Sequence, residues 1–196
     1  MIIVVMGLPG TGKSVVAAAL GKRLRAPVVR TDMIRRALFR PVGLKRLRNL
    51  ESKFLYDVQR ANVGREITGE ARQVMEAQKE VVYNALFLLV EELAGTGKDV
   101  VMDATFFRES YRARARAVAR RLGQRIFFVQ TVCPDEIVKA RMSRRNIVNV
   151  ANARFQTYLQ FKKTFEPARG PVLFVDTTHP LRESVDFVLK HIGWRK

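Results

Sequence analysis

The chain has 196 residues, 47% of them hydrophobic, and a formal net charge of +18 with a pI near 11.0. This length and composition predict one domain, with room for a small lid, and the charge predicts phosphorylated or polyanionic partners. A single cysteine, Cys133, excludes an internal disulfide and favours a reducing compartment, so we expect a cytoplasmic protein. The longest apolar run, residues 85–90, falls short of the ~20 residues that a membrane span needs, and we expect no signal peptide.

The first fourteen residues carry the clearest motif. A short β-branched apolar run, residues 2–6, is typical of a buried strand and leads into Gly-Leu-Pro-Gly-Thr-Gly-Lys-Ser at 7–14. This segment matches the phosphate-binding pattern G-x-x-x-x-G-K-[ST], which requires a strand before it and a helix after it. Lys13 is expected to contact the β- and γ-phosphates of a nucleoside triphosphate, and Ser14 to hold Mg²⁺. The nucleotide-binding residues that we expect are Gly7, Pro9, Gly10, Thr11, Gly12, Lys13, Ser14 and Thr177.

After this loop, short apolar strands alternate with helical patterns. Residues 42–68 mix leucines with bases and favour short helices on the rim of a cleft. The alternation predicts an α/β domain with a parallel sheet, and a single domain is expected to span residues 1–196. Strands are predicted at 26–30, 99–103, 125–132 and 171–175, and helices at 15–24, 33–38, 69–94, 109–122, 134–145, 152–165 and 181–192.

Two aspartates follow predicted strands, and each has a catalytic and a structural interpretation. Asp103 ends the strand 99–103, where a carboxylate can organise Mg²⁺ together with Ser14. Asp32 follows the strand 26–30. With Arg35 it could orient an acceptor hydroxyl, take its proton and grip a neighbouring anionic group. Either aspartate could instead cap the helix that follows it.

A cluster of arginines follows the fourth predicted strand. Arg141, Arg144 and Arg145 lie at the end of a predicted helix, where a lid over residues 141–166 would close on the triphosphate. An arginine there can neutralise charge on the transferred phosphoryl group. Alternatively, these cations complement the carboxyl end of the helix. The sequence does not distinguish which of the three would act.

Two further segments are strongly basic. Residues 22–48 hold ten bases against one acid, and residues 108–125 hold seven arginines against one acid. Because these segments lack acids to pair with, we expect them to bind anions rather than to form surface ion pairs. The second segment also has an arginine stripe beside aromatics, which is typical of a nucleic-acid groove, although such aromatics more often belong to the core. These residues are Arg112, Arg116 and Arg120, with Phe106 and Phe107.

Taken together, these motifs resemble those of AAA-type P-loop kinases, in the group that holds phage polynucleotide 5′-kinase, zeta toxins and chloramphenicol phosphotransferase. The resemblance implies a P-loop NTPase fold with five parallel strands, and ATP with Mg²⁺ as ligands. It also implies Asp32 as the base that activates the acceptor, Arg35 as the substrate clamp and a lid arginine, Arg141 or Arg145 among the candidates. The likeness lies in residues 7–14, 31–35, 100–106, 141–145, 165–167 and 175–177.

An ATP-dependent kinase that phosphorylates a hydroxyl is the leading hypothesis. The basic segments and the likeness to polynucleotide kinase favour a nucleic-acid 5′-hydroxyl as the acceptor. The alternative acceptor is a small metabolite, a nucleotide sugar or an antibiotic, in which case the charge is only a property of the surface. A third possibility is an ATPase or a nucleotide-dependent RNA-binding module. A GTPase is disfavoured because no guanine-reading Asn-Lys-x-Asp motif occurs.

Overall fold

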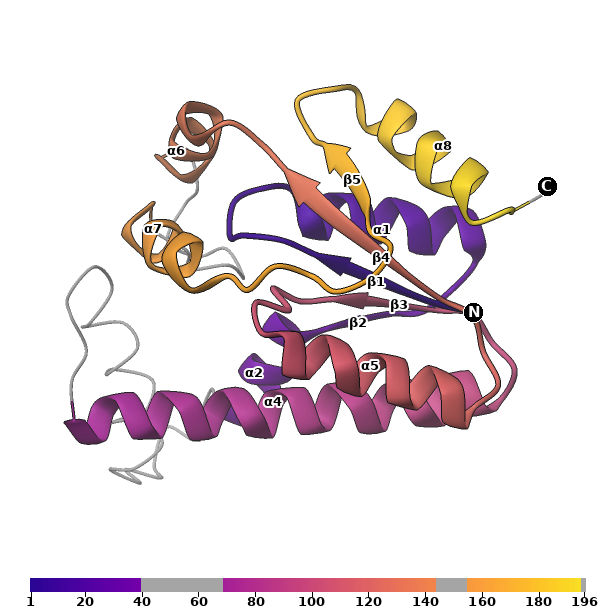
Figure 1. Cartoon of the computed structure of the whole chain (residues 1–196), viewed down its shortest axis with the longest axis horizontal. Helices are drawn as coiled ribbons and strands as arrows, with labels where there is room; N and C mark the ends of the chain where they lie inside the picture. Colours follow the sequence, from indigo (N-terminus) through magenta and orange to yellow (C-terminus); the bar gives the residue numbers. More distant parts are fainter. Residues whose placement is uncertain (40–68, 144–154, 195–196) are drawn as a thin grey trace.

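The computed structural model describes residues 1–39, 69–143 and 155–194. The predicted rim segment 42–68 and the part 144–154 of the predicted lid lie outside the described residues. The elements follow in the order β1 (Ile2–Met6), α1 (Lys13–Leu24), β2 (Val28–Arg30), α2 (Thr31–Phe39), α4 (Gly69–Gly95), β3 (Val100–Asp103), α5 (Glu109–Arg121), β4 (Ile126–Val132), α6 (Asp135–Ser143), α7 (Phe155–Thr164), β5 (Leu173–Asp176) and α8 (Leu181–His191) (Figure 1).

The five strands form one parallel sheet in the order β2-β3-β1-β4-β5. In the central strand β1, Ile2 pairs with Val100 of β3 on one side and with Ile126 of β4 on the other. All five residues of β1 are buried, which explains why this strand is continuously apolar rather than alternating. The predicted α/β class with a parallel sheet is confirmed.

Helices cover both faces of the sheet (Figure 1). Alternate residues of β1 belong to two hydrophobic cores. Ile2, Val4 and Met6 pack with apolar residues of α4 and α5, whereas Ile3 and Val5 pack with those of α1 and α8. The strands are thus held from both faces, while the loops at their carboxyl ends remain available for function.

The connection between α1 and α2 is tighter than the sequence predicts. Gly21 of α1 comes so close to β2 that a Cβ there would lie 2.4 Å from Val28 Cγ2. β2 ends at Arg30 and α2 begins at Thr31, without a loop between them. The predicted helix 33–38 therefore begins two residues early, and Asp32 lies in its first turn.

In the part of the chain that the structure describes, no helix is both long and apolar enough to cross a bilayer.

Candidate functional site

The candidate site lies at the carboxyl edge of the sheet. In an open parallel sheet, ligands bind where the chain leaves neighbouring strands toward opposite faces. That point lies between the adjacent strands β1 and β3, because β1 leads to α1 on one face and β3 leads to α5 on the other. The phosphate loop follows β1 and Asp103 ends β3, so the two flank this point.

The phosphate loop has the backbone that its glycines predict. Gly7, Gly10 and Gly12 have φ values of 134°, 84° and 91°, which residues with a side chain rarely adopt. At Gly7, a Cβ would also lie 2.6 Å from the carbonyl oxygen of Thr131 in β4. Glycine is therefore needed here both for the turn and for the approach of β4. Since α1 begins at Lys13, the positive end of this helix faces the loop.

Side chains brace the phosphate loop internally and against β4. Thr11 Oγ1 donates to the carbonyl oxygen of Leu8 over 2.7 Å and shares a second hydrogen bond of 2.7 Å with Thr131 Oγ1. Lys13 Nζ donates to the same Leu8 carbonyl over 2.8 Å. The lysine ammonium group thus lies over its own loop.

Asp103 is a buried carboxylate, with 5% of its surface exposed. It is in register with Val5 of β1 and with Arg30 of β2, and its Oδ2 accepts a hydrogen bond of 3.1 Å from Arg30 Nε. Arg108, not Asp103, is at the N-cap of α5, which excludes the capping interpretation for Asp103. Arg30 was missed by sequence reasoning. The one sequence feature that could have indicated Arg30 is that it ends a predicted strand, as Asp103 does.

The oxygens at this edge suit Mg²⁺, which usually keeps several waters and is held by one or two side chains together with substrate phosphates. Ser14, in the first turn of α1, supplies a hydroxyl, and Asp103, at the end of the adjacent strand β3, supplies a carboxylate. Among the described residues, no cluster of three or more His, Cys, Asp or Glu side chains could hold a metal ion.

Asp32 and Arg35 lie together at the start of α2, next to the edge strand β2. Arg35 Nη1 is 3.5 Å from Asp32 Oδ1, and the two side chains are 39% and 31% exposed. Thr31 Oγ1 donates to the carbonyl oxygen of Asp103 over 3.4 Å, which ties this helix to the end of β3. The carboxylate and guanidinium groups are thus loosely paired, and both are accessible to solvent.

Arg141 and Thr177 meet on the opposite side of the phosphate loop from Asp32. Arg141 donates to Thr177 twice, from Nη1 to Oγ1 over 2.8 Å and from Nη2 to the carbonyl oxygen over 2.6 Å. Thr177 Oγ1 in turn donates to the Thr11 carbonyl oxygen over 2.8 Å, and a Cβ at Gly12 would lie 3.2 Å from Thr177 Cγ2. Arg141 therefore holds Thr177 against the loop from the β5 side. The other candidates, Arg144 and Arg145, lie outside the described residues.

The helix α6 packs directly on the phosphate loop, and α7 is fastened to α6. A Cβ at Gly10 would lie 2.7 Å from Met142 Cε of α6. Tyr158 Oη of α7 donates to Asp135 Oδ1 over 2.5 Å, and Lys162 Nζ of α7 lies 2.7 Å from Asp135 Oδ2. The hydrogen bonds from Lys162 and Tyr158 hold the pKa of the Asp135 carboxyl below its usual range.

Most arginines of the segment 108–125 are paired, so the expectation that they bind anions rather than form ion pairs is wrong. The missing acids come from α4, which runs beside α5 (Figure 1). Counting charge along the chain missed them because α4 and α5 are separated by β3 and a loop. The pairs between the two helices are Arg108–Glu76 at 2.7 Å, Arg114–Glu80 at 3.5 Å and Arg121–Glu91.

The predicted arginine stripe on α5 is not an open basic surface. Arg112 is 0% exposed and Arg116 pairs with Glu109, while Arg120 is exposed. The stripe fails because the helix face that carries Arg112 and Arg116 packs against residues 166–169. The neighbouring Phe106 and Phe107 are buried, which confirms their interpretation as core residues.

Several solved structures of similar fold are kinases. A sugar kinase from Janibacter sp. HTCC2649 is 19% identical, with a TM-score of 0.65, over 98% of this chain and 94% of that chain. A gluconokinase from Sinorhizobium meliloti is 22% identical, with a TM-score of 0.60, over 98% and 90%. The Mycobacterium tuberculosis APS kinase CysC, solved with AMPPNP and APS, is 19% identical, with a TM-score of 0.60, over 98% and 96%.

At these identities the likeness to the solved structures shows a P-loop NTPase-like fold. None of the curated proteins matches the chain. The model of the AAA domain family (AAA_33) matches residues 2–168, which is most of the sequence. The phosphate loop, Asp32, Asp103 and α6 all fall within the matched region. The chain therefore belongs to the AAA domain family.

Proposed function

We propose that the protein is an ATP-dependent kinase that transfers the γ-phosphoryl group to a hydroxyl of a small metabolite. One observation carries the proposal, namely the order of groups along the carboxyl edge. The pair of Asp32 and Arg35 comes first, then Asp103, then the phosphate loop, and finally Arg141 with Thr177. An acceptor site and a nucleotide site would thus lie on opposite sides of the Asp103 carboxylate.

On the donor side, the glycine-rich backbone and the positive end of α1 suit the phosphates of ATP. Lys13 Nζ, which donates to the Leu8 carbonyl, would exchange this hydrogen bond for one to a phosphate oxygen. Mg²⁺ held by Ser14 and Asp103 would neutralise charge on the β- and γ-phosphates. Arg141 acts on this side by keeping Thr177 against the loop.

On the acceptor side, Asp32 would orient the acceptor hydroxyl and take its proton. The acceptor oxygen forms a bond to the γ-phosphorus, the bond from that phosphorus to the bridging oxygen breaks, and ADP leaves. Arg35 lies only 3.5 Å from Asp32 and is partly exposed, so it can turn to an anionic group on the acceptor.

The pairing of the arginines in α5 supports a metabolite over a polynucleotide, because it removes the predicted basic groove. The similar structures named as a sugar kinase and a gluconokinase agree with a small acceptor. A nucleic-acid 5′-hydroxyl is the second candidate, favoured by the net charge of +18.

A transfer assay distinguishes the two acceptors. The protein is incubated with labelled ATP, Mg²⁺ and, separately, a panel of sugars and sugar acids or an oligonucleotide with a 5′-hydroxyl. We expect label on one class of metabolite and none on the oligonucleotide. Label on the oligonucleotide alone, with binding that weakens steeply between about 50 and 200 mM salt, would establish the second candidate instead.

Asp32→Asn tests the assignment of the base. We expect transfer to fall by about 10²–10⁴-fold, the usual contribution of a positioned general base, with ATP affinity nearly unchanged. Asp186→Asn on α8 is the matched control, since Asp186 pairs only with surface arginines among the described residues. Full turnover in Asp32→Asn would show that this aspartate serves only as an acidic residue in the first turn of α2.

A further inference from the structure

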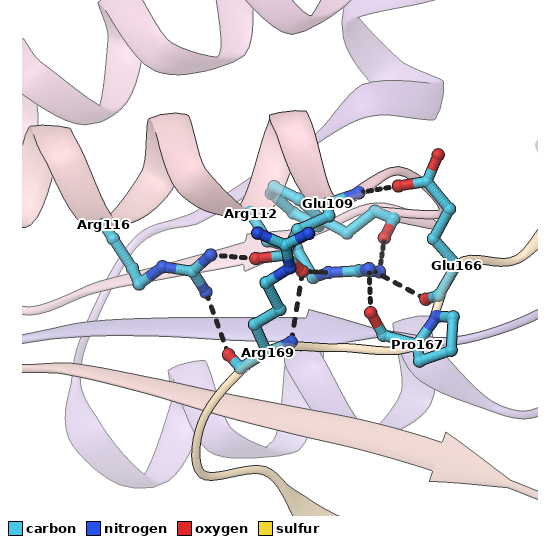
Figure 2. A network of polar contacts seen from close by, with 7 residues as sticks. Glu109, Arg112, Arg116, Glu166, Pro167 and Arg169 are labelled. Atoms are coloured by element: carbon cyan, nitrogen blue, oxygen red, sulfur yellow. Dashed lines mark hydrogen bonds and ion pairs between the residues drawn. The ribbon is translucent and has the colours of Figure 1, made fainter.

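Arg112 of α5 is a fully buried cation whose guanidinium group joins three separate segments (Figure 2). Its Nη1 donates to the Phe106 carbonyl oxygen over 2.6 Å. Its Nη2 donates to the carbonyl oxygens of Glu166 and Pro167 over 2.8 and 2.9 Å. Its Nε donates to Glu109 Oε2 over 2.7 Å. The planar fork of an arginine is needed to reach all four acceptors at once.

A buried charge is costly unless it is paired, and Glu109 supplies the partner. Burial alone would raise the pKa of this carboxyl, but the hydrogen bonds from Arg112 and Arg116 outweigh burial and bring it below its usual range. Glu109 also accepts a hydrogen bond from the backbone N–H of Arg169 over 3.2 Å. Arg112 and Glu109 therefore both hydrogen-bond to the backbone of the segment that follows α7 (Figure 2).

Arg112 and its four acceptors form a clamp between two segments. The first of these segments is the turn 104–106, which leads away from the candidate site. Phe106 has a φ of 47°, which is unfavourable for an aromatic residue, and its N–H donates to Tyr83 Oη over 2.9 Å. The preceding carbonyl, that of Thr105, accepts a hydrogen bond of 3.3 Å from the N–H of Gly7, the first residue of the phosphate loop. The turn 104–106 thus links Asp103 to the phosphate loop, and Arg112 fixes its far end.

The other end of the clamp is the segment that follows α7. The Glu166 N–H donates to the Phe107 carbonyl oxygen over 2.9 Å, and Glu166 Oε2 accepts a hydrogen bond of 2.6 Å from the Glu109 N–H. α7 itself is fastened to α6, which packs on Gly10 of the phosphate loop. Arg112 therefore bonds both to the turn after Asp103 and to the segment that follows α7.

We propose that Arg112 is a positioning residue for phosphoryl transfer, a role that rests on the proposed function. By holding the turn 104–106 against the segment 166–167, it fixes where Asp103 and Gly7 stand relative to each other. It touches no reacting group itself. Displacements of about 1 Å at an active site can cost as much as 10²-fold in rate, so loosening this clamp is expected to lower kcat more than substrate affinity.

Arg112→Lys is the main test, with Arg116→Lys as the matched control. A lysine at 112 keeps the charge next to Glu109 but loses the fork that bonds the three carbonyls. Arg116 pairs with the same Glu109, yet its other hydrogen bond is to the Arg169 carbonyl, and its guanidinium group lies over the Phe128 ring rather than at the turn. We expect Arg112→Lys to lower kcat by about tenfold or more, with the KM for ATP within about threefold of wild type. Arg116→Lys should leave both parameters within about twofold.

Amide hydrogen exchange supplies a readout that does not depend on catalysis. In Arg112→Lys the Gly7 and Glu166 amides should exchange at least about tenfold faster than in the wild type and in Arg116→Lys. Unchanged exchange at Gly7, or a kcat equal to that of the control, would overturn the proposal. If the wild type phosphorylates no acceptor, the proposed function fails. Exchange at Gly7 still decides whether Arg112 positions the loop.

Discussion

The carboxyl edge of the sheet and the helix α5 are both rich in cations, yet they use them differently. On α5 and at its N-cap, Arg108, Arg114 and Arg121 each pair with a glutamate of α4, and Arg112 is fully buried. At the carboxyl edge, the cations lie beside groups suited to a ligand. Lys13 lies over the phosphate loop, and Arg35 lies beside the partly exposed carboxylate of Asp32.

The difference shows that a count of charges along the chain does not measure an accessible charge. The seven arginines of residues 108–125 looked like an anion-binding surface, but a neighbouring helix supplies most of their partners. The edge cations are fewer, and their partners can be exchanged for phosphate or an anionic acceptor. Substitutions at the edge should therefore change activity, whereas substitutions in the ion pairs of α5, Arg112 apart, should change stability.

The strongest test of this contrast is Lys13→Ala. We expect phosphoryl transfer to fall by about 10²–10³-fold, the usual cost of removing one group that stabilises charge in the transition state. Steady-state transfer is the measurement. Lys22→Ala, an exposed lysine on the same helix, should keep the wild-type rate. Equal losses in both variants would mean that general charge, not the phosphate loop, drives activity.

Glu109→Gln should act on stability, with a dependence on pH. Its carboxyl pKa is lower in the folded state than in the unfolded state, so the carboxylate stabilises the fold above its unfolded pKa. This contribution disappears as the pH falls through the lower folded pKa. Urea unfolding should show a loss of about 2–3 kcal/mol for the variant at pH 7, shrinking toward pH 3. A loss that is independent of pH would contradict the ion-pair account.

The smallest effect is expected for Arg114→Ala. Arg114 is 42% exposed, pairs with Glu80 at 3.5 Å and lies 4.7 Å from the centre of the Phe87 ring. Exposed pairs of this kind contribute at most about 1 kcal/mol, so thermal unfolding should shift by only a few degrees. Transfer should remain at the wild-type rate. A clear loss of nucleic-acid binding in this variant would instead restore a basic surface on α5.

The parts that the sequence predicted well are those determined locally. The phosphate loop is one contiguous motif between an apolar strand and a helix, and its glycines have the positive φ values that it requires. The central strand is equally legible, because burial on both faces leaves a continuous apolar run. The position of Asp103 at the end of β3 was predicted for the same reason, because a polar residue ends such a run.

The parts that were missed depend on contacts between distant segments. Arg30 pairs with Asp103 only because β2 and β3 are neighbours in the sheet, an order that periodicity does not reveal. Arg112 has the same spacing on its helix as exposed arginines, and its burial depends on the later segment 166–167. No local pattern distinguishes a clamping arginine from a solvated one.

The central place of β1 has a consequence for how the chain is made. Its first residue in the sheet, Ile2, pairs with Val100 and Ile126, so β1 leaves the ribosome long before either neighbouring strand. At common rates of translation, of about 5–20 residues per second, the gap to β3, the earlier of the two neighbours, is roughly 5–20 s. During that interval a fully apolar strand has no sheet to join. We therefore expect the nascent strand β1 to need transient shelter, from α1 or from a chaperone, until about half of the protein has been synthesised.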